Sequence, residues 1–173
     1  MNKKNIIMIG MPASGKSTIG VILAKTMGKA FLDTDLLIQE HEGLLLQEII
    51  NQKGHAHFRK VEEHVLASLE TEGTVVATGG SAVYYDGAME HLGENGIRVY
   101  LSLSLPEITK RLSNIKTRGI TMGPGETLAD LYAQRLPLYE RYADITIETE
   151  GLSVEQSVEK IISALETYSD VLI

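Results

Sequence analysis

A glycine-rich stretch near the amino terminus, GMPASGKST at Gly10–Thr18, has the residue types and the spacing that bind phosphate. It satisfies the pattern G-x-x-x-x-G-K-[ST], with an apolar segment before it and a helical pattern after it. Glycines let backbone N–H groups curl around a phosphate, and a helix N-terminus adds positive potential. We therefore expect Lys16 to bind phosphate oxygens as a catalytic residue, and the Ser17 hydroxyl to bind a magnesium ion.

Two carboxylates end the second apolar segment, in FLDTDLLIQE. Asp33 and Asp35 are two residues apart, so at an extended strand end both side chains would face the crevice at the carboxyl edge of a sheet. One could hold magnesium, and the other could accept a hydrogen bond or a proton from an acceptor hydroxyl. The alternative is that one of them caps the helix that follows.

Two further motifs could contact a small anionic ligand. In FRKVEE, Arg59 and Glu62 are three apart on a helical pattern, so a pair on one face would orient the guanidinium for a bidentate grip on a carboxylate. The alternative is a solvated surface pair. Gly79 and Gly80 end the third apolar segment, where the missing side chains permit close approach of a ligand, or form only a plain turn.

Two more arginines lie in suggestive places. Arg118 lies in SNIKTRGITMGPGE, about residues 113–126, which we expect to form a mobile lid that brings a cation onto the phosphoryl group. Arg135 lies in a helical pattern that Pro137 should kink or reshape. Each arginine, taken alone, could instead be a solvated surface residue.

The elements that must position these residues alternate between strands and helices. Five short strands are predicted, at Asn5–Ile9, Ala30–Asp33, Thr74–Thr78, Arg98–Leu101 and Ile145–Glu148. Helical patterns cover residues 16–27, 44–52, 58–70, 86–94, 106–112, 127–142 and 153–168. This alternation predicts an α/β fold whose parallel sheet is covered on both faces. We expect one domain over residues 1–173.

Composition excludes several classes of function. The chain has 173 residues and no cysteine, which excludes disulfides, thiolate metal sites and thiol nucleophiles. Its formal net charge of −7 argues against general binding to nucleic acid or anionic membranes. The apolar run before Gly10 has only five residues, too few for a signal-peptide core or a membrane span, so we expect a cytoplasmic protein. The five histidines have no partners at zinc-ligand spacing, and we expect them on the surface.

The phosphate-binding motif alone does not choose among nucleotide-dependent enzymes. The chain carries no N-K-x-D motif for reading guanine, and 173 residues are too few for a large motor ATPase. A small kinase fits best.

Taken together and in order, these motifs resemble the shikimate kinase family, small P-loop proteins of the nucleoside-monophosphate-kinase-like group. The resemblance rests on the phosphate loop, D-x-D, F-R-x-x-E, the glycine turn, Arg118 and R-x-P-L-Y at Arg135–Tyr139. It implies a three-layer P-loop kinase fold with a five-stranded parallel sheet in the order 2-3-1-4-5. It also implies transfer of the ATP γ-phosphoryl group to the 3-hydroxyl of shikimate, with Mg²⁺.

The resemblance also implies a role for each matching residue. Catalysis would fall to Lys16, Asp35 and Arg118. ATP would be bound by Gly10, Ala13, Ser14, Gly15, Lys16, Ser17, Thr18, Arg111 and Arg118. Shikimate would be bound by Asp35, Arg59, Gly79, Gly80 and Arg135, and magnesium by Ser17 and Asp33. Glu62 would steady Arg59, substrate-binding helices would span about residues 35–70, and the enzyme would act as a monomer.

Three departures from the family pattern bear on the acceptor. Ser81 replaces the usual third glycine of the turn, Ala13 replaces a common glycine of the phosphate loop, and Gly119 and Ile120 follow Arg118 in the lid. A kinase for another small hydroxy acid such as gluconate, or a non-catalytic nucleotide-binding module, therefore stays open as an alternative.

Overall fold

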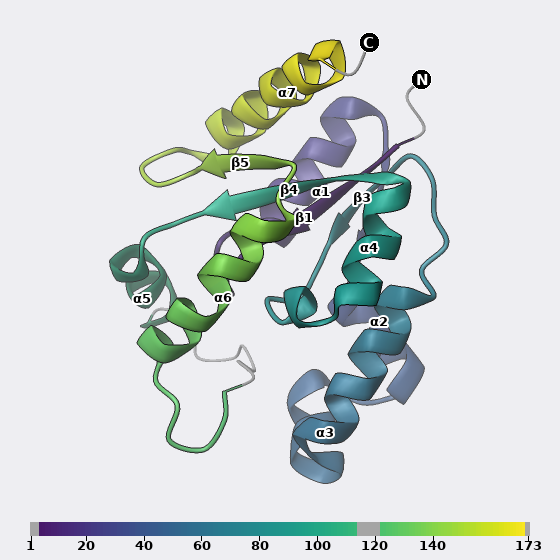
Figure 1. The fold of residues 1–173 in the computed structure, drawn as a ribbon, viewed down its shortest axis with the longest axis vertical. Coiled ribbons are helices and arrows are strands. Elements are labelled where there is room, and N and C mark those ends of the chain that lie inside the picture. Colours follow the sequence, from purple (N-terminus) through teal and green to yellow (C-terminus); the bar gives the residue numbers. More distant parts are fainter. Residues whose placement is uncertain (1–3, 114–121, 172–173) are drawn as a thin grey trace.

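One parallel sheet of five strands organises the chain in a computed structural model that describes residues 4–113 and 122–171 (Figure 1). The strands lie in the order β2-β3-β1-β4-β5, as predicted. Their bounds are β1 Asn5–Ile9, β2 Ala30–Asp33, β3 Thr74–Ala77, β4 Gly96–Ser102 and β5 Ile145–Glu148. Each strand therefore lies where the sequence pattern predicts it, with β4 extended at both ends.

The helices cover both faces of this sheet. Their bounds are α1 Lys16–Met27, α2 Thr34–Glu42, α3 Leu46–Ala67, α4 Asp86–Glu94, α5 Leu105–Ser113, α6 Leu128–Tyr142 and α7 Val154–Val171, with a short 3₁₀ turn, η1, at Ala82–Tyr84. Figure 1 shows α1 and α7 on one face and α4 and α6 on the other, which gives three layers.

The alternation of side chains along the central strand builds two apolar cores. Ile6 and Met8 of β1 pack with α1 and α7, whereas Ile7 and Ile9 pack with α4 and α6. All five residues of β1 are buried, because a parallel sheet between two helical layers has no solvent face. The predicted α/β class is confirmed, because the strands form one parallel sheet with helices on both faces.

Residues 34–67 differ from the sequence pattern at their start, where a helix follows β2 directly. A helix begins at Thr34 because the Asp33 carboxylate caps it, accepting a hydrogen bond from the Asp35 N–H at 3.0 Å. The two patterns predicted at residues 44–52 and 58–70 correspond to the two helical segments of α3, which meet at a kink at Gly54. Gly54 has φ 84° and ψ 165°, a conformation that favours glycine. In Figure 1, α2 and α3 lie together below the sheet.

One helix begins with a capping box and another continues through a proline. Ser153 and Gln156 exchange hydrogen bonds of 2.9 and 3.1 Å at the start of α7, which form a capping box. By contrast, α6 continues through Pro137 without a break. Of the predicted lid, residues 114–121 lie outside the described residues.

Candidate active site

The phosphate loop joins β1 to α1 at the carboxyl edge of the sheet. Gly10 and Gly15 have φ of 148° and 95°, so both positions require glycine. Ala13 also has a positive φ, 63°, which costs an L-residue on the order of 1–2 kcal/mol. The loop therefore has a positive φ at this position although Ala13 replaces the glycine of the family pattern.

Lys16 begins α1 and is buried, with 8% of its surface exposed. Its ammonium group donates to the carbonyl oxygens of Gly10 and Met11 at 2.7 and 2.8 Å. Ser14 lies within 3.4 Å of the same ammonium group. These contacts hold the cation against the loop whose backbone N–H groups would bind phosphate.

Ser17 and the second strand meet beside this loop. The Ser17 hydroxyl donates to Asp33 Oδ2 at 2.6 Å. Asp33 thus caps α2 with one oxygen and contacts Ser17 with the other, so the capping alternative is correct for Asp33 without excluding a metal role. The prediction that Asp35 lies on a strand end is wrong, because it lies in the first turn of α2.

A cavity of about 390 Å³ extends from the phosphate loop toward α3 and α6. Lys16, Ser17 and Asp33 line its phosphate-loop end, and Asp35 and Arg135 line it as well. The structure therefore brings the predicted phosphate, metal, acceptor and carboxylate groups to one cavity. A concave site with a few convergent charged groups is typical of small-ligand binding.

The two glycines after β3 are packed against charged side chains. A Cβ at Gly79 would lie 2.8 Å from Glu62 Oε1 and 3.0 Å from Asp35 Oδ1. A Cβ at Gly80 would lie 2.8 Å from Arg135 Nη1. A side chain at either position would have to displace Glu62, Asp35 or Arg135, and the predicted approach of a ligand here stays a prediction.

Arg135 is not a solvated surface residue, since only 2% of it is exposed. Its Nε donates to the Tyr84 hydroxyl at 3.3 Å, and its guanidinium lies 5.3 Å from the centre of the Tyr84 ring. Arg59, by contrast, is exposed and lines a second cavity of about 420 Å³ together with Arg135. The two cavities share Phe58, Ser81 and Arg135.

The predicted pairing of Arg59 with Glu62 is wrong. Glu62 is 1% exposed, and its carboxylate accepts hydrogen bonds from the Ser81 hydroxyl at 2.8 and 2.7 Å and from the Tyr85 hydroxyl at 2.7 Å. Burial raises the pKa of Glu62, and these two donors oppose that rise. The sequence indicated Ser81 only as a departure from the family, and nothing in it pointed to Tyr85.

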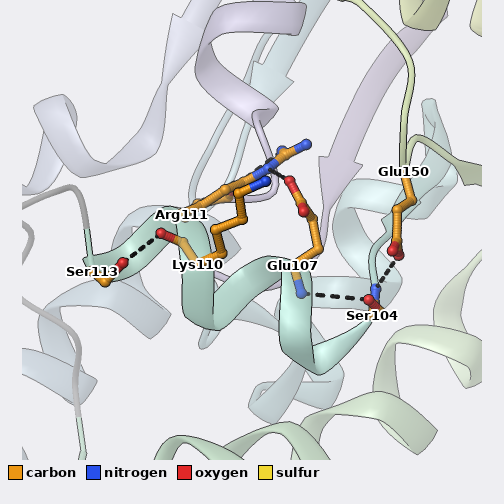
Figure 2. A network of polar contacts seen from close by, with 7 residues as sticks. Ser104, Glu107, Lys110, Arg111, Ser113 and Glu150 are labelled. Atoms are coloured by element: carbon orange, nitrogen blue, oxygen red, sulfur yellow. Dashed lines mark hydrogen bonds and ion pairs between the residues drawn. The ribbon is translucent and has the colours of Figure 1, made fainter.

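Arg111 belongs to α5, where Figure 2 shows it with its polar neighbours, and its side chain reaches the phosphate loop. Its Nε donates to Glu107 Oε1 at 2.8 Å, and its Nη1 donates to the Ala13 carbonyl at 3.4 Å. Ser104 accepts from the Glu107 N–H, and the Ser104 N–H donates to Glu150. This network places the Arg111 guanidinium next to the loop, and its role in binding ATP stays a prediction.

Two predicted ATP-binding residues remain. Thr18 is exposed in the first turn of α1. Arg118 lies outside the described residues.

Within residues 4–113 and 122–171, the structure shows no cluster of three His, Cys, Asp or Glu residues that could hold a metal ion. Ser17 and Asp33 nevertheless fit Mg²⁺, which takes one or two protein ligands and completes its shell with water and phosphate oxygens. No helix among these residues is long and apolar enough to cross a membrane.

The strand order, the phosphate loop and the charged cavity beside it together define a small-molecule kinase of the P-loop class. Comparison with known proteins narrows this class. The sequence profile described as shikimate kinase matches residues 12–166, and the chain belongs to the shikimate kinase family. Members of this family use ATP.

Individual relatives support the same assignment over nearly the full length. The shikimate kinase of Thermodesulfovibrio yellowstonii is 36% identical over 96% of this chain and 98% of its own. That of Thiobacillus denitrificans is 39% identical over 89% of this chain and 86% of its own. The structure of the Acinetobacter baumannii shikimate kinase in complex with shikimate has a TM-score of 0.85 at 32% identity, covering 95% of this chain and 94% of that chain. These findings favour a shikimate kinase over a gluconate kinase or a non-catalytic module.

Proposed function

We propose that this chain transfers the γ-phosphoryl group of ATP to the 3-hydroxyl of shikimate at the 390 Å³ cavity. The observation that carries the proposal is the single cavity lined by Lys16, Asp33, Asp35 and Arg135. Phosphoryl transfer asks mainly for alignment and charge neutralisation, and these residues supply both.

At the donor end, the backbone N–H groups of Gly10, Ala13, Ser14, Gly15, Lys16, Ser17 and Thr18 would surround the β-phosphate. The Lys16 ammonium would bind β- and γ-phosphate oxygens. Ser17 and Asp33 would hold Mg²⁺, which neutralises charge on the phosphates when bound. Arg111 would lie near the adenine, because it already lies beside the loop at Ala13.

At the acceptor end, Asp35 would accept the proton of the 3-hydroxyl. The hydroxyl oxygen would then bond to the γ-phosphorus as ADP leaves. Arg135 and Arg59 would bind the shikimate carboxylate. Gly79 and Gly80 would let the hydroxylated ring of shikimate approach the backbone. Arg135 is well suited to this role because it is buried, and a buried guanidinium is only weakly screened.

Arg118 would close over the phosphates from the lid. An Arg118→Ala variant would then keep ATP affinity and lose most of its turnover. Equal loss of both would make Arg118 a plain binding residue.

A coupled assay for ADP tests the proposal. Shikimate should support turnover that gluconate, homoserine and nucleoside monophosphates do not, EDTA should abolish it, and NMR of the product should place phosphate on the 3-oxygen. Turnover with gluconate alone would overturn the assignment. We further propose a monomer of a single domain, tested by sedimentation, and a cytoplasmic location, tested by cell fractionation.

A further inference from the structure

The buried carboxylate of Glu62 has an unusual set of partners for an acidic group in a binding cavity. It lines the 390 Å³ cavity and is 1% exposed. The one Ser81 O–H lies 2.8 and 2.7 Å from the two carboxylate oxygens, and the Tyr85 hydroxyl donates to Oε2 at 2.7 Å. These two donors fix the rotation of the carboxylate about its last bond.

The groups that face Glu62 are those expected to bind the acceptor. The charge of Asp35 on α2 raises the pKa of Glu62, and the charge of Arg135 on α6 lowers it. Glu62 Oε1 and Asp35 Oδ1 also flank the same glycine, Gly79. A shift of the Glu62 carboxylate would therefore change its electrostatic interactions with Asp35 and with Arg135.

The donors come from the segment that follows the glycine turn rather than from α3 itself. Ser81 is 7% exposed and Tyr85 is 8% exposed, so both hydroxyls act away from bulk water. Arg59 makes no ion pair with Glu62 in the part of the chain that the structure describes, and lines the neighbouring cavity instead. Ser81 and Tyr85, rather than Arg59, are therefore the residues that hold the Glu62 carboxylate.

We propose that Ser81 and Tyr85 are positioning residues, which fix Glu62 between Asp35 and Arg135 and thereby set the affinity for shikimate. The proposal rests on the proposed function, because it assigns Asp35 and Arg135 to the acceptor. Within the described residues, both hydroxyls bond to Glu62 and not to the phosphate loop, so ATP binding should not depend on them.

The first test removes one hydroxyl and keeps the ring. Tyr85→Phe should raise KM for shikimate about 10-fold, the scale of a hydrogen bond to a charged group, while KM for ATP and kcat stay within about threefold. Tyr142→Phe is the control, because it also removes a hydroxyl from a buried tyrosine that donates to a carboxylate, the exposed one of Asp86. The control should leave both KM values unchanged.

The second test uses the serine. Ser81→Ala should raise KM for shikimate by a similar factor, and Ser81→Thr, which keeps a hydroxyl, should restore most of the affinity. Ser81→Gly, the residue of the family pattern, provides a further hydroxyl-free variant if Tyr85→Phe folds poorly. In a Glu62→Gln background, Tyr85→Phe should add little, because the two changes disturb one interaction.

The outcomes separate this proposal from the proposed function. If the unmodified enzyme does not phosphorylate shikimate, the proposed function fails. If it does, but Tyr85→Phe and Ser81→Ala change KM for shikimate no more than Tyr142→Phe, the positioning role is overturned. A loss of thermal stability without a selective rise in KM would also overturn it, since that is the result of a purely structural contact.

Discussion

The Ser17 hydroxyl donates to Asp33 Oδ2 at 2.6 Å, which joins the first turn of α1 to the carboxyl end of β2. The other oxygen of Asp33 accepts from the Asp35 N–H and begins α2. One aspartate therefore connects the phosphate loop with the helix that carries Asp35. Asp33 thus caps α2 and is also the proposed ligand of Mg²⁺, and substitutions at Asp33 can separate these two roles.

Asp33→Asn keeps an oxygen that can cap α2 but removes the charge. We expect nearly unchanged thermal stability and a requirement for about 10-fold more Mg²⁺, because changing the groups that hold a metal ion and its ligands typically lowers metal affinity 10–100-fold. Asp33→Ala should show the same magnesium effect and also lose about 1 kcal/mol of stability with the cap. Magnesium titrations of turnover and urea unfolding measure the two effects, and an Asn variant with wild-type magnesium dependence would contradict the metal role.

Lys16→Met should lower kcat/KM for ATP by about 10²–10³, the usual cost of removing one preorganised cation or donor at a developing charge. Folding should be retained, because methionine keeps most of the length of the buried Lys16 side chain and fills irregular space readily. Steady-state kinetics against ATP check the result. Lys25→Met, on the exposed side of the same helix, is the matched control and should be neutral.

Arg135→Lys should raise KM for shikimate by about 10–100-fold, because lysine keeps the charge but loses the planar fork that binds a carboxylate through two bonds. Arg59→Lys should cost less, since Arg59 is exposed and its charge is more strongly screened. Arg141→Lys, at an exposed arginine of the same helix α6, is the control. A larger effect at Arg59 than at Arg135 would contradict this ranking.

The sequence predicted the sheet because local signals determine it. Apolar runs such as Asn5–Ile9 must be buried on both faces, and alternating helices leave only parallel crossovers between them. The phosphate loop was predictable for the same reason, since its glycines, Lys16 and Ser17 are adjacent in the chain.

Contacts between distant segments were not predictable in the same way. Arg59 and Glu62 have the right helical spacing for a pair, but spacing does not reveal that Ser81 and Tyr85 approach Glu62 from another segment. Likewise, the start of α2 at Thr34 depends on the Asp33 cap, which overrides the extended pattern before it. Burial of Arg135 is also a tertiary property that no local pattern encodes.

Glu42 provides a pH-dependent test of the α2–α3 region, away from the phosphate loop. Its carboxylate accepts from Lys53 at 2.7 Å and contacts His57 Nε2 at 2.9 Å, and these partners lower the pKa of Glu42 to about 2. A carboxyl group whose pKa is lower in the folded state stabilises the fold above its unfolded pKa, near 4.5, and loses this effect as the pH falls toward 2. Glu42→Gln should therefore lower Tm at pH 7, and the difference from the unmodified protein should shrink between about pH 4.5 and 2.

Thermal unfolding measured from pH 7 to pH 2.5 checks this expectation for Glu42→Gln. Glu40→Gln, at an exposed carboxylate of the same helix, should change Tm little at any pH. Lys53→Met should reproduce part of the Glu42→Gln effect, because it removes one of the two partners that favour the ionised carboxylate. A Tm difference that stays constant across the acidic range would mean that Glu42 acts through packing, since the loss of a paired charge must disappear once the carboxylate is protonated in both states.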